Sequence, residues 1–242
     1  MVGGQSIPPL DLVHLYGRDG YVVVKVFDEK EEKVIKNFAI DWVEDLIRQC
    51  INNGSELIDH LAQYHTWVDK FPIEHGKLFK AANRHRKPVG EVRECLLNDK
   101  VWTVLSKISP IPCSIWDEGL GWVGFRLIRP GMGDGYPASR KEWGPAKNVI
   151  SCWIPIIGHS ENETLALMPG SHLREFEKYL PSESKFCNDE FRLANMPNDM
   201  AFIRLRLGKG EAIFYHPRLI HTEDVESSDV TRLNLELRFS SG

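Results

Sequence analysis

The sequence lacks the features that would tie it to a membrane, to nucleic acid or to a disulfide framework. It holds no apolar run of transmembrane length, no internal repeat and no recognisable signal peptide. Its 30 lysines and arginines do not outnumber its 34 aspartates and glutamates, so no basic field recruits nucleic acid. Its five cysteines are scattered without a C-x-x-C pair, which argues against a zinc knuckle and favours a reducing compartment. We therefore expect a cytoplasmic protein that binds a small molecule.

The clearest pattern lies near the C-terminus, where polar and apolar residues alternate over 232–239. A period of two is typical of a strand with one buried face. On the polar face Arg232 and Asn234 point in the same direction, and burying a guanidinium is costly unless an anion meets it. His221 ends the preceding apolar segment. The pattern predicts a pocket that holds a carboxylate and a metal.

Helical patterns fill most of residues 1–109, whereas strand patterns dominate 110–242. We expect a single domain over 1–242, in which N-terminal helices support a β-barrel of roughly eight short strands. Segment 173–197 is polar, and we expect it to begin as a helix and continue as a long loop. Strands are expected at 21–27, 122–129, 148–156, 164–172, 201–207, 210–220 and 231–239.

The phrase His216-Pro-Arg-Leu-Ile-His221, with an arginine 232 − 221 = 11 residues later, resembles the phytanoyl-CoA dioxygenase family of Fe(II)/2-oxoglutarate oxygenases. Segments 149–156 and 169–172 follow the order of that family, and the resemblance spans about residues 10 to 240. It implies a mainly β fold with N-terminal helices, a double-stranded β-helix of the jelly-roll, cupin-like type.

The same resemblance implies roles for individual residues. His221 would be an iron ligand, and Arg232 would clamp the far carboxylate of 2-oxoglutarate, with Asn234 beside it. Trp153 would form a wall of the cofactor pocket. The implied activity is that of a 2-oxoglutarate-dependent dioxygenase, an oxidoreductase acting on a small, anionic metabolite.

One motif of the family is missing. The first histidine and the carboxylate of the iron site usually come as His-x-Asp after a proline. Aligning Pro137 with that proline puts Ser139 and Lys141 in the ligand positions. A hydroxyl is too weakly basic for Fe(II), and an ammonium repels it, so the usual two-histidine, one-carboxylate site cannot be assembled.

Three explanations stay open. An altered iron site would use His221 with Asp134 or Glu142, and with His216 as a second imidazole. Alternatively, the chain keeps the fold and the Arg232 clamp without iron. In the third explanation, Lys141 or His221 serves as acid or base in metal-free chemistry. The alternative to an oxygenase is thus a metal-free barrel that binds or isomerises an anionic metabolite such as a nucleotide sugar.

Other histidine-bearing stretches have less specific interpretations. His172 is expected to cap its turn rather than to catalyse, and His159 is expected in a loop. The basic stretch 74–87 is either a solvated surface or a contact for a substrate phosphate or carboxylate.

Overall fold

The structure is a computed structural model. It describes residues 9–50, 61–68, 88–116, 122–128, 130, 139–141, 149–159, 165–176, 178–179, 190–193, 198–222 and 229–241. Predicted segments and residues between these ranges, including the basic stretch 74–87, lie outside the described part of the chain.

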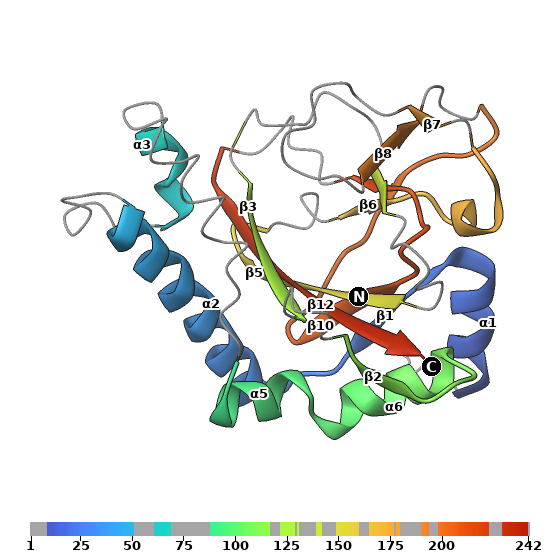
Figure 1. Cartoon of the computed structure of the whole chain (residues 1–242), viewed down its shortest axis with the longest axis horizontal. Helices are drawn as coiled ribbons and strands as arrows, with labels where there is room; N and C mark the ends of the chain where they lie inside the picture. Colours follow the sequence, from blue (N-terminus) through green and yellow to red (C-terminus); the bar gives the residue numbers. More distant parts are fainter. Residues whose placement is uncertain are drawn as a thin grey trace.

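The strands form two six-stranded sheets (Figure 1). The first follows the order β1-β10-β5-β12-β2, with β3 also paired to β12, and the second follows β7-β8-β4-β11-β6-β9. The first sheet contains β1 (Tyr21–Lys25), β2 (Cys113–Ile115), β3 (Val123–Ile128), β5 (Val149–Ile157), β10 (Glu211–Tyr215) and β12 (Arg232–Ser241). The second contains β4 (Ser139–Lys141), β6 (Ala166–Leu167), β7 (Lys178–Tyr179), β8 (Glu190–Leu193), β9 (Ile203–Arg204) and β11 (His221–Thr222). Every pairing is antiparallel, and the predicted jelly-roll fold is confirmed.

Helices cover the outer face of the first sheet. They are α1 (Pro9–Asp19), α2 (Glu29–Cys50), α5 (Gly90–Leu96) and α6 (Asp99–Ile108), and they lie around the lower edge of the molecule in Figure 1. Asp28 begins α2 with a capping box: its carboxylate accepts from the Glu31 amide at 2.9 Å, and the Glu31 carboxylate accepts from the Asp28 amide at 2.8 Å. A short segment, η2 (Leu61–Gln63) and α3 (His65–Val68), lies apart from these helices.

The two faces of the first sheet bury different side chains. The outer-face residues of β12, which include Leu233 and Phe239, join one apolar cluster with the helices. On the inner face, Trp153, Ile213 and Tyr215 pack with Leu167 of the second sheet and with Leu165 and Leu219, which lie beside its strands β6 and β11. Because successive side chains of a strand point to opposite faces, the alternation over 232–239 divides structural residues from residues inside the barrel.

The structure corrects several boundaries. The predicted long loop 173–197 contains β7 and β8, and its first residues form a 3-10 turn, η3 (Ser171–Leu173). The strand predicted at 201–207 is reduced to β9, whose two residues are exposed. The described part of the chain already holds twelve strands rather than about eight. Two- and three-residue strands are fixed by their partners across the sheet, and a periodicity cannot be read from so few residues.

Within the described residues, no helix is both long and apolar enough to cross a membrane. Cys95, Cys113 and Cys152 are free thiols in the structure.

Candidate active site inside the barrel

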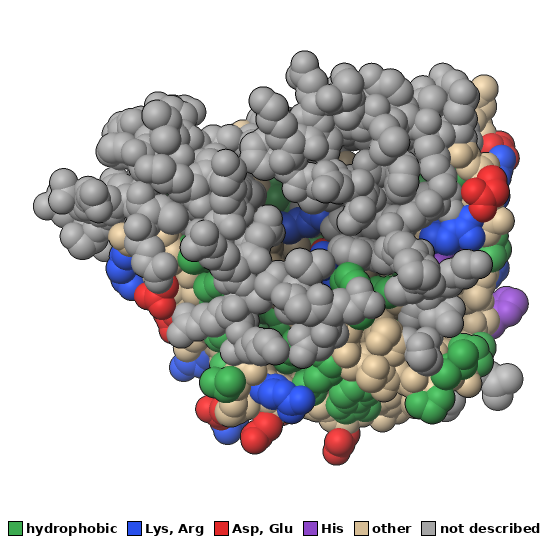
Figure 2. Space-filling model, viewed as in Figure 1, with side chains coloured by type: hydrophobic (Ala, Val, Ile, Leu, Met, Phe, Trp, Pro, Cys, Tyr) green, Lys and Arg blue, Asp and Glu red, His purple; other side chains and the backbone are tan. Residues whose placement is uncertain are grey.

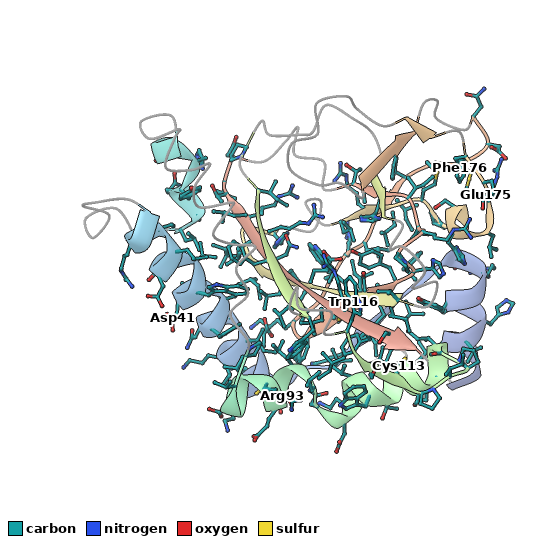
Figure 3. All side chains as sticks on the ribbon, in the orientation of Figure 1. Asp41, Arg93, Cys113, Trp116, Glu175 and Phe176 are labelled. Carbon is teal, nitrogen blue, oxygen red and sulfur yellow. The ribbon has the colours of Figure 1, made fainter. Side chains whose placement is uncertain are left out.

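Strand β12 lines the barrel interior with a row of polar side chains. Arg232, Asn234 and Glu236 are 1%, 0% and 4% exposed. Arg238 continues the row with a mostly buried side chain, which lies over the ring of Trp116 (labelled in Figure 3) at 5.5 Å. Figure 2 shows Lys or Arg side chains in the hollow at the middle of one face. Buried polar groups of this kind need partners, so the neighbours of each residue decide what it does.

Arg232 is the first residue of β12, and the preceding residue, Thr231, is fixed by hydrogen bonds of both its backbone and its side chain. The Thr231 amide donates to the carbonyl oxygen of Ala62 at 2.8 Å, and its hydroxyl accepts from the His65 amide at 3.0 Å. Gly158 approaches the Thr231 carbonyl so closely that a Cβ would collide with it, and its φ of +71° also favours glycine. The backbone beside the guanidinium is therefore fixed by two other elements.

Asn234 is the least satisfied polar residue of this row. Neither its amide nitrogen nor its amide oxygen has a hydrogen-bond partner among the described residues. Its neighbours across the sheet are Arg126 of β3 and Pro155 of β5. An unpaired buried amide costs about 1–3 kcal/mol, so a ligand that pairs with it is strongly favoured.

Glu236, two residues along, has the opposite environment. Its Oε1 accepts from the Ser151 hydroxyl at 3.2 Å and from the Tyr215 hydroxyl at 3.1 Å. Its Oε2 lies 4.0 Å from Nε of Arg126 and 3.6 Å from a terminal nitrogen of Arg238. This carboxylate is fully engaged by the protein. Cys152 points to the opposite face of β5, where burial, together with the charge of Glu236, raises the pKa of its thiol.

His221 faces the interior from β11 and is 4% exposed. Its Nδ1 lies 2.7 Å from the carbonyl oxygen of Leu219. A carbonyl only accepts, so Nδ1 carries the proton and Nε2 carries the lone pair that a metal or a proton would use. The ring also makes an edge contact with Tyr215 at 5.0 Å between centroids.

The position predicted to replace the first metal histidine lies directly beside His221. Ser139 of β4 is the cross-strand partner of His221, and Lys141 follows two residues later in the same strand. The assignment of Ser139 and Lys141 to the ligand positions stays a prediction. The side chains of Ser139 and Lys141, and all of Asp134, lie outside the described part of the chain. Within that part, no group of three His, Cys, Asp or Glu side chains could hold a metal ion.

Trp153 lies on the inner face of β5, 2% exposed, with the ring of His159 against its edge at 5.0 Å. Nε2 of His159 lies 3.0 Å from the carbonyl oxygen of Leu233, to which it donates. His159 lies in the loop after β5, as predicted, where it contacts the tryptophan and joins the end of β5 to β12. A single histidine after a strand gives no sequence signal for this contact.

His172 and His216 belong to a different cluster. Nε2 of His172 lies 3.2 Å from the carbonyl oxygen of Gly17, and its ring lies 5.3 Å from that of His216, which in turn neighbours Tyr16 at 6.4 Å. His172 therefore fastens α1 to the barrel instead of capping its own turn. The role of His216 as a second imidazole beside His221 stays a prediction.

Sequence reasoning missed the residues that surround Glu236. Ser151, Tyr215 and Arg126 come from three different strands, and no motif joins them along the chain. The sequence could have indicated only Glu236 itself. If Arg232 faces inward, the alternation of side chains along β12 places Glu236 on the same inward face.

Part of the chain matches a known protein family. Residues 134–232 match the family model "Phytanoyl-CoA dioxygenase (PhyH)". Over this stretch the sequence is similar to the phytanoyl-CoA dioxygenase family. Among curated proteins, none matches the chain.

Solved structures of related fold are numerous. An apo structure of the non-heme monooxygenase ThoJ aligns with a TM-score of 0.59 at 12% identity, covering 96% of this chain and 77% of the other. The epimerase SnoN, in complex with Fe3+, alpha ketoglutarate and nogalamycin RO, aligns with a TM-score of 0.56 at 14% identity, covering 96% and 83%. EctD from S. alaskensis, with 2-oxoglutarate and 5-hydroxyectoine, aligns with a TM-score of 0.52 at 14% identity, covering 99% and 80%. These alignments show that the chain shares its fold with the three proteins.

Proposed function

We propose that the barrel interior binds 2-oxoglutarate and that the chain is an Fe(II)/2-oxoglutarate-dependent oxygenase with an altered metal site. The observation that carries this proposal is the pair on the inner face of β12: a buried guanidinium, Arg232, followed two residues later by the unpaired amide of Asn234. A guanidinium binds a carboxylate by charge-assisted hydrogen bonds, and an amide nitrogen adds a further donor. Trp153 supplies an apolar wall for the carbon chain of the ligand.

Iron fits this site only in part. His221 lies on the barrel interior with Nδ1 fixed by the Leu219 carbonyl, as is usual for a metal-bound histidine. Asp134 is proposed as the carboxylate ligand. Iron bound there with 2-oxoglutarate and oxygen would supply the oxidising chemistry of this class.

The residues of the chain have simpler tasks. Arg232 binds and orients the far carboxylate, while Asn234 donates to the ligand within the same row. Tyr215 packs against the ring of His221 and keeps it directed inward. Lys141 lies on the strand beside His221 and is proposed as an acid or base toward a small, polar, anionic substrate.

The second candidate function is a metal-free barrel that binds or isomerises an anionic metabolite such as a nucleotide sugar. The pairing of His221 with Ser139 favours it, because the residue beside the histidine is a poor iron ligand. We further propose that residues 1–242 form one domain, since helices and sheet share one apolar cluster. The cytoplasmic location remains a prediction.

Metal and cofactor binding distinguish these functions. Protein prepared anaerobically with Fe(II) and 2-oxoglutarate is expected to hold about one iron and to develop the weak visible absorption of the iron–oxoacid complex. His221→Ala should lose both, whereas His14→Ala, on the exposed face of α1, should keep them. Thermal stabilisation by 2-oxoglutarate that depends on Arg232 but needs no metal would favour the second function. Unchanged anion binding in Arg232→Met would overturn both.

A further inference from the structure

We propose that Ser171 is a positioning residue for His221. It acts through a single peptide group, the one that joins Leu219 to Ile220. The inference rests on the proposed function, in which His221 is the working histidine of the barrel. It assigns to Ser171 the control of the orientation and the tautomer of that imidazole.

Two hydrogen bonds meet at this peptide group, one on each side. The Ile220 amide donates to the hydroxyl oxygen of Ser171 at 2.8 Å, and both residues are fully buried. On the other side, the Leu219 carbonyl oxygen accepts from Nδ1 of His221 at 2.7 Å. The peptide group is trans and planar, so its N–H and its C=O point in opposite directions, and a bond that fixes one also fixes the other. The serine hydroxyl, the peptide group and the imidazole therefore form one chain of hydrogen bonds.

The direction of this chain favours one tautomer of His221. Hydrogen bonds linked through one peptide group polarise each other, so the bond to Ser171 makes the Leu219 carbonyl a better acceptor. A better acceptor holds the imidazole proton on Nδ1 and leaves the lone pair on Nε2, which is the form that binds a metal. Without the serine oxygen, the buried Ile220 amide loses its partner, and the peptide group gains by turning toward another acceptor.

The serine is itself held in place by its surroundings. The Ser171 amide donates to the Met168 carbonyl at 3.2 Å, and the Met168 amide donates to the Ile220 carbonyl at 2.9 Å. The preceding residue, Gly170, donates its amide to the Asp19 carbonyl at 2.9 Å, at the corner between α1 and β1. Both peptide groups of Ile220 are thus bonded to the turn that carries the serine. This turn fixes the backbone that leads into β11.

The tautomer of His221 is the readout, because a loss of overall stability does not by itself move a ring proton. Full-length protein labelled with the heavy isotope of nitrogen is studied by NMR with a metal chelator present. At about pH 8.5 a histidine of ordinary pKa is neutral, and long-range proton–nitrogen couplings show which ring nitrogen carries the proton. The spectrum of His221→Gln identifies the signals of His221. Fe(II) affinity is measured separately, under anaerobic conditions, by competition with a coloured chelator.

In the wild type, Nδ1 of His221 should carry the proton. Ser171→Ala should shift the population toward the tautomer protonated on Nε2 and weaken Fe(II) binding about tenfold, as expected for a residue that orients a metal ligand. Ser171→Thr keeps the hydroxyl and should retain the wild-type signals. If Ser171→Ala does not fold, Ser171→Cys, whose sulfur is a weaker acceptor, should show a smaller shift in the same direction.

Ser109 provides the matched control, because it is also a buried serine that bonds to the backbone. Its hydroxyl donates to the Ile111 carbonyl at 2.7 Å and accepts from the Ile111 amide at 3.3 Å, at the end of α6. Ser109→Ala should lower Tm by an amount similar to that of Ser171→Ala. It should leave both the tautomer of His221 and Fe(II) binding unchanged.

The tautomer decides the role of Ser171. A wild-type proton on Nε2, an unchanged tautomer in Ser171→Ala, or an equal shift in Ser109→Ala would overturn that role. The proposed function is decided by the iron measurements alone: it stands if the wild type binds Fe(II) and His221→Ala does not. A serine-dependent tautomer in a protein that binds no Fe(II) would contradict the iron site and leave Ser171 as the positioning residue of a metal-free barrel.

Discussion

Two buried positions inside the barrel, two residues apart on β12, differ in whether the protein supplies hydrogen-bond partners to the polar side chain. We call them the Glu236 level and the Asn234 level. At Glu236 the protein itself supplies two hydroxyl donors and two arginines. At Asn234, which is equally buried, the described residues supply no hydrogen bond to either amide atom. Within the described part of the chain, the polar atoms of Glu236 are hydrogen-bonded and those of Asn234 are not.

Within one strand, the two positions should therefore contribute to different properties: one to the stability of the fold and the other to ligand binding. A buried group that the fold already satisfies contributes to the stability of the folded state and loses little when no ligand is present. A buried group without a partner lowers stability, and its persistence indicates a partner from outside the chain. Substitutions at the two levels should therefore have effects of opposite sign.

The largest expected effect is at Glu236. Glu236→Gln removes a buried charge from between Arg126 and Arg238, which leaves two guanidiniums without their carboxylate. We expect the free energy of unfolding to fall by roughly 3 kcal/mol, measured by urea denaturation. Glu91→Gln, which breaks the exposed ion pair with Lys30, is the control and should change stability by less than about 0.5 kcal/mol. Equal losses in both variants would contradict the buried network.

Asn234 should respond in the other direction. Asn234→Leu replaces an unpaired amide with an apolar group of similar shape, so the ligand-free protein should be unchanged or more stable by about 1 kcal/mol. Binding of 2-oxoglutarate should weaken about tenfold, as measured by calorimetry.

Asn98 provides the matched control for this substitution. Its amide donates to Val26 and Glu31 and accepts from the Val101 amide, so all its groups are used at the start of α6. Asn98→Leu should lower stability by about 1–2 kcal/mol without affecting 2-oxoglutarate. If Asn234→Leu is as destabilising as Asn98→Leu, the amide of Asn234 has a partner within the protein and the comparison of levels is wrong.

A smaller effect is expected for Tyr215→Phe. This change removes one donor to Glu236, while the ring that contacts His221 stays in place. Unfolding free energy should fall by roughly 1–2 kcal/mol, because the carboxylate keeps its other partners. Iron content should be preserved, and its loss would show that the hydroxyl, rather than the ring, maintains the orientation of His221.

The sequence pointed to the residues that we propose bind a ligand, but not to those that surround Glu236. Arg232, Asn234 and His221 follow from local spacing and alternation, since each lies in or beside a long, regular strand. Arg126 and Tyr215 matter only through pairings between β3, β12, β5 and β10, which are distant in sequence. Likewise the short strands β7, β8 and β9 were missed or misjudged, because two to four residues carry no readable period.

His172 is a buried polar residue outside the barrel interior, and only one of its two ring nitrogens is hydrogen-bonded by the described residues. It tests whether a partly hydrogen-bonded group has an effect on stability between those of Glu236 and Asn234. His172 donates through one ring nitrogen to the Gly17 carbonyl, while its other ring nitrogen has no partner among the described residues. Burial, assisted by the charge of Arg218, lowers the pKa of His172 below its ordinary value of 6.5, although the Gly17 bond and Asp19 act the other way. The stability of the contact between α1 and the barrel should therefore depend on pH through this residue.

The sign follows from proton uptake. As pH falls below 6.5, the unfolded chain protonates His172 before the folded chain does, so the free energy of unfolding decreases until the folded form is protonated as well. Urea denaturation from about pH 7.5 to about pH 5 should show this decrease in the wild type, and His172→Gln should lose part of it. His14→Gln, at an exposed site on the same helix, should keep the wild-type pH dependence. Identical curves for His172→Gln and wild type would mean that the half-satisfied ring takes up its proton as readily folded as unfolded.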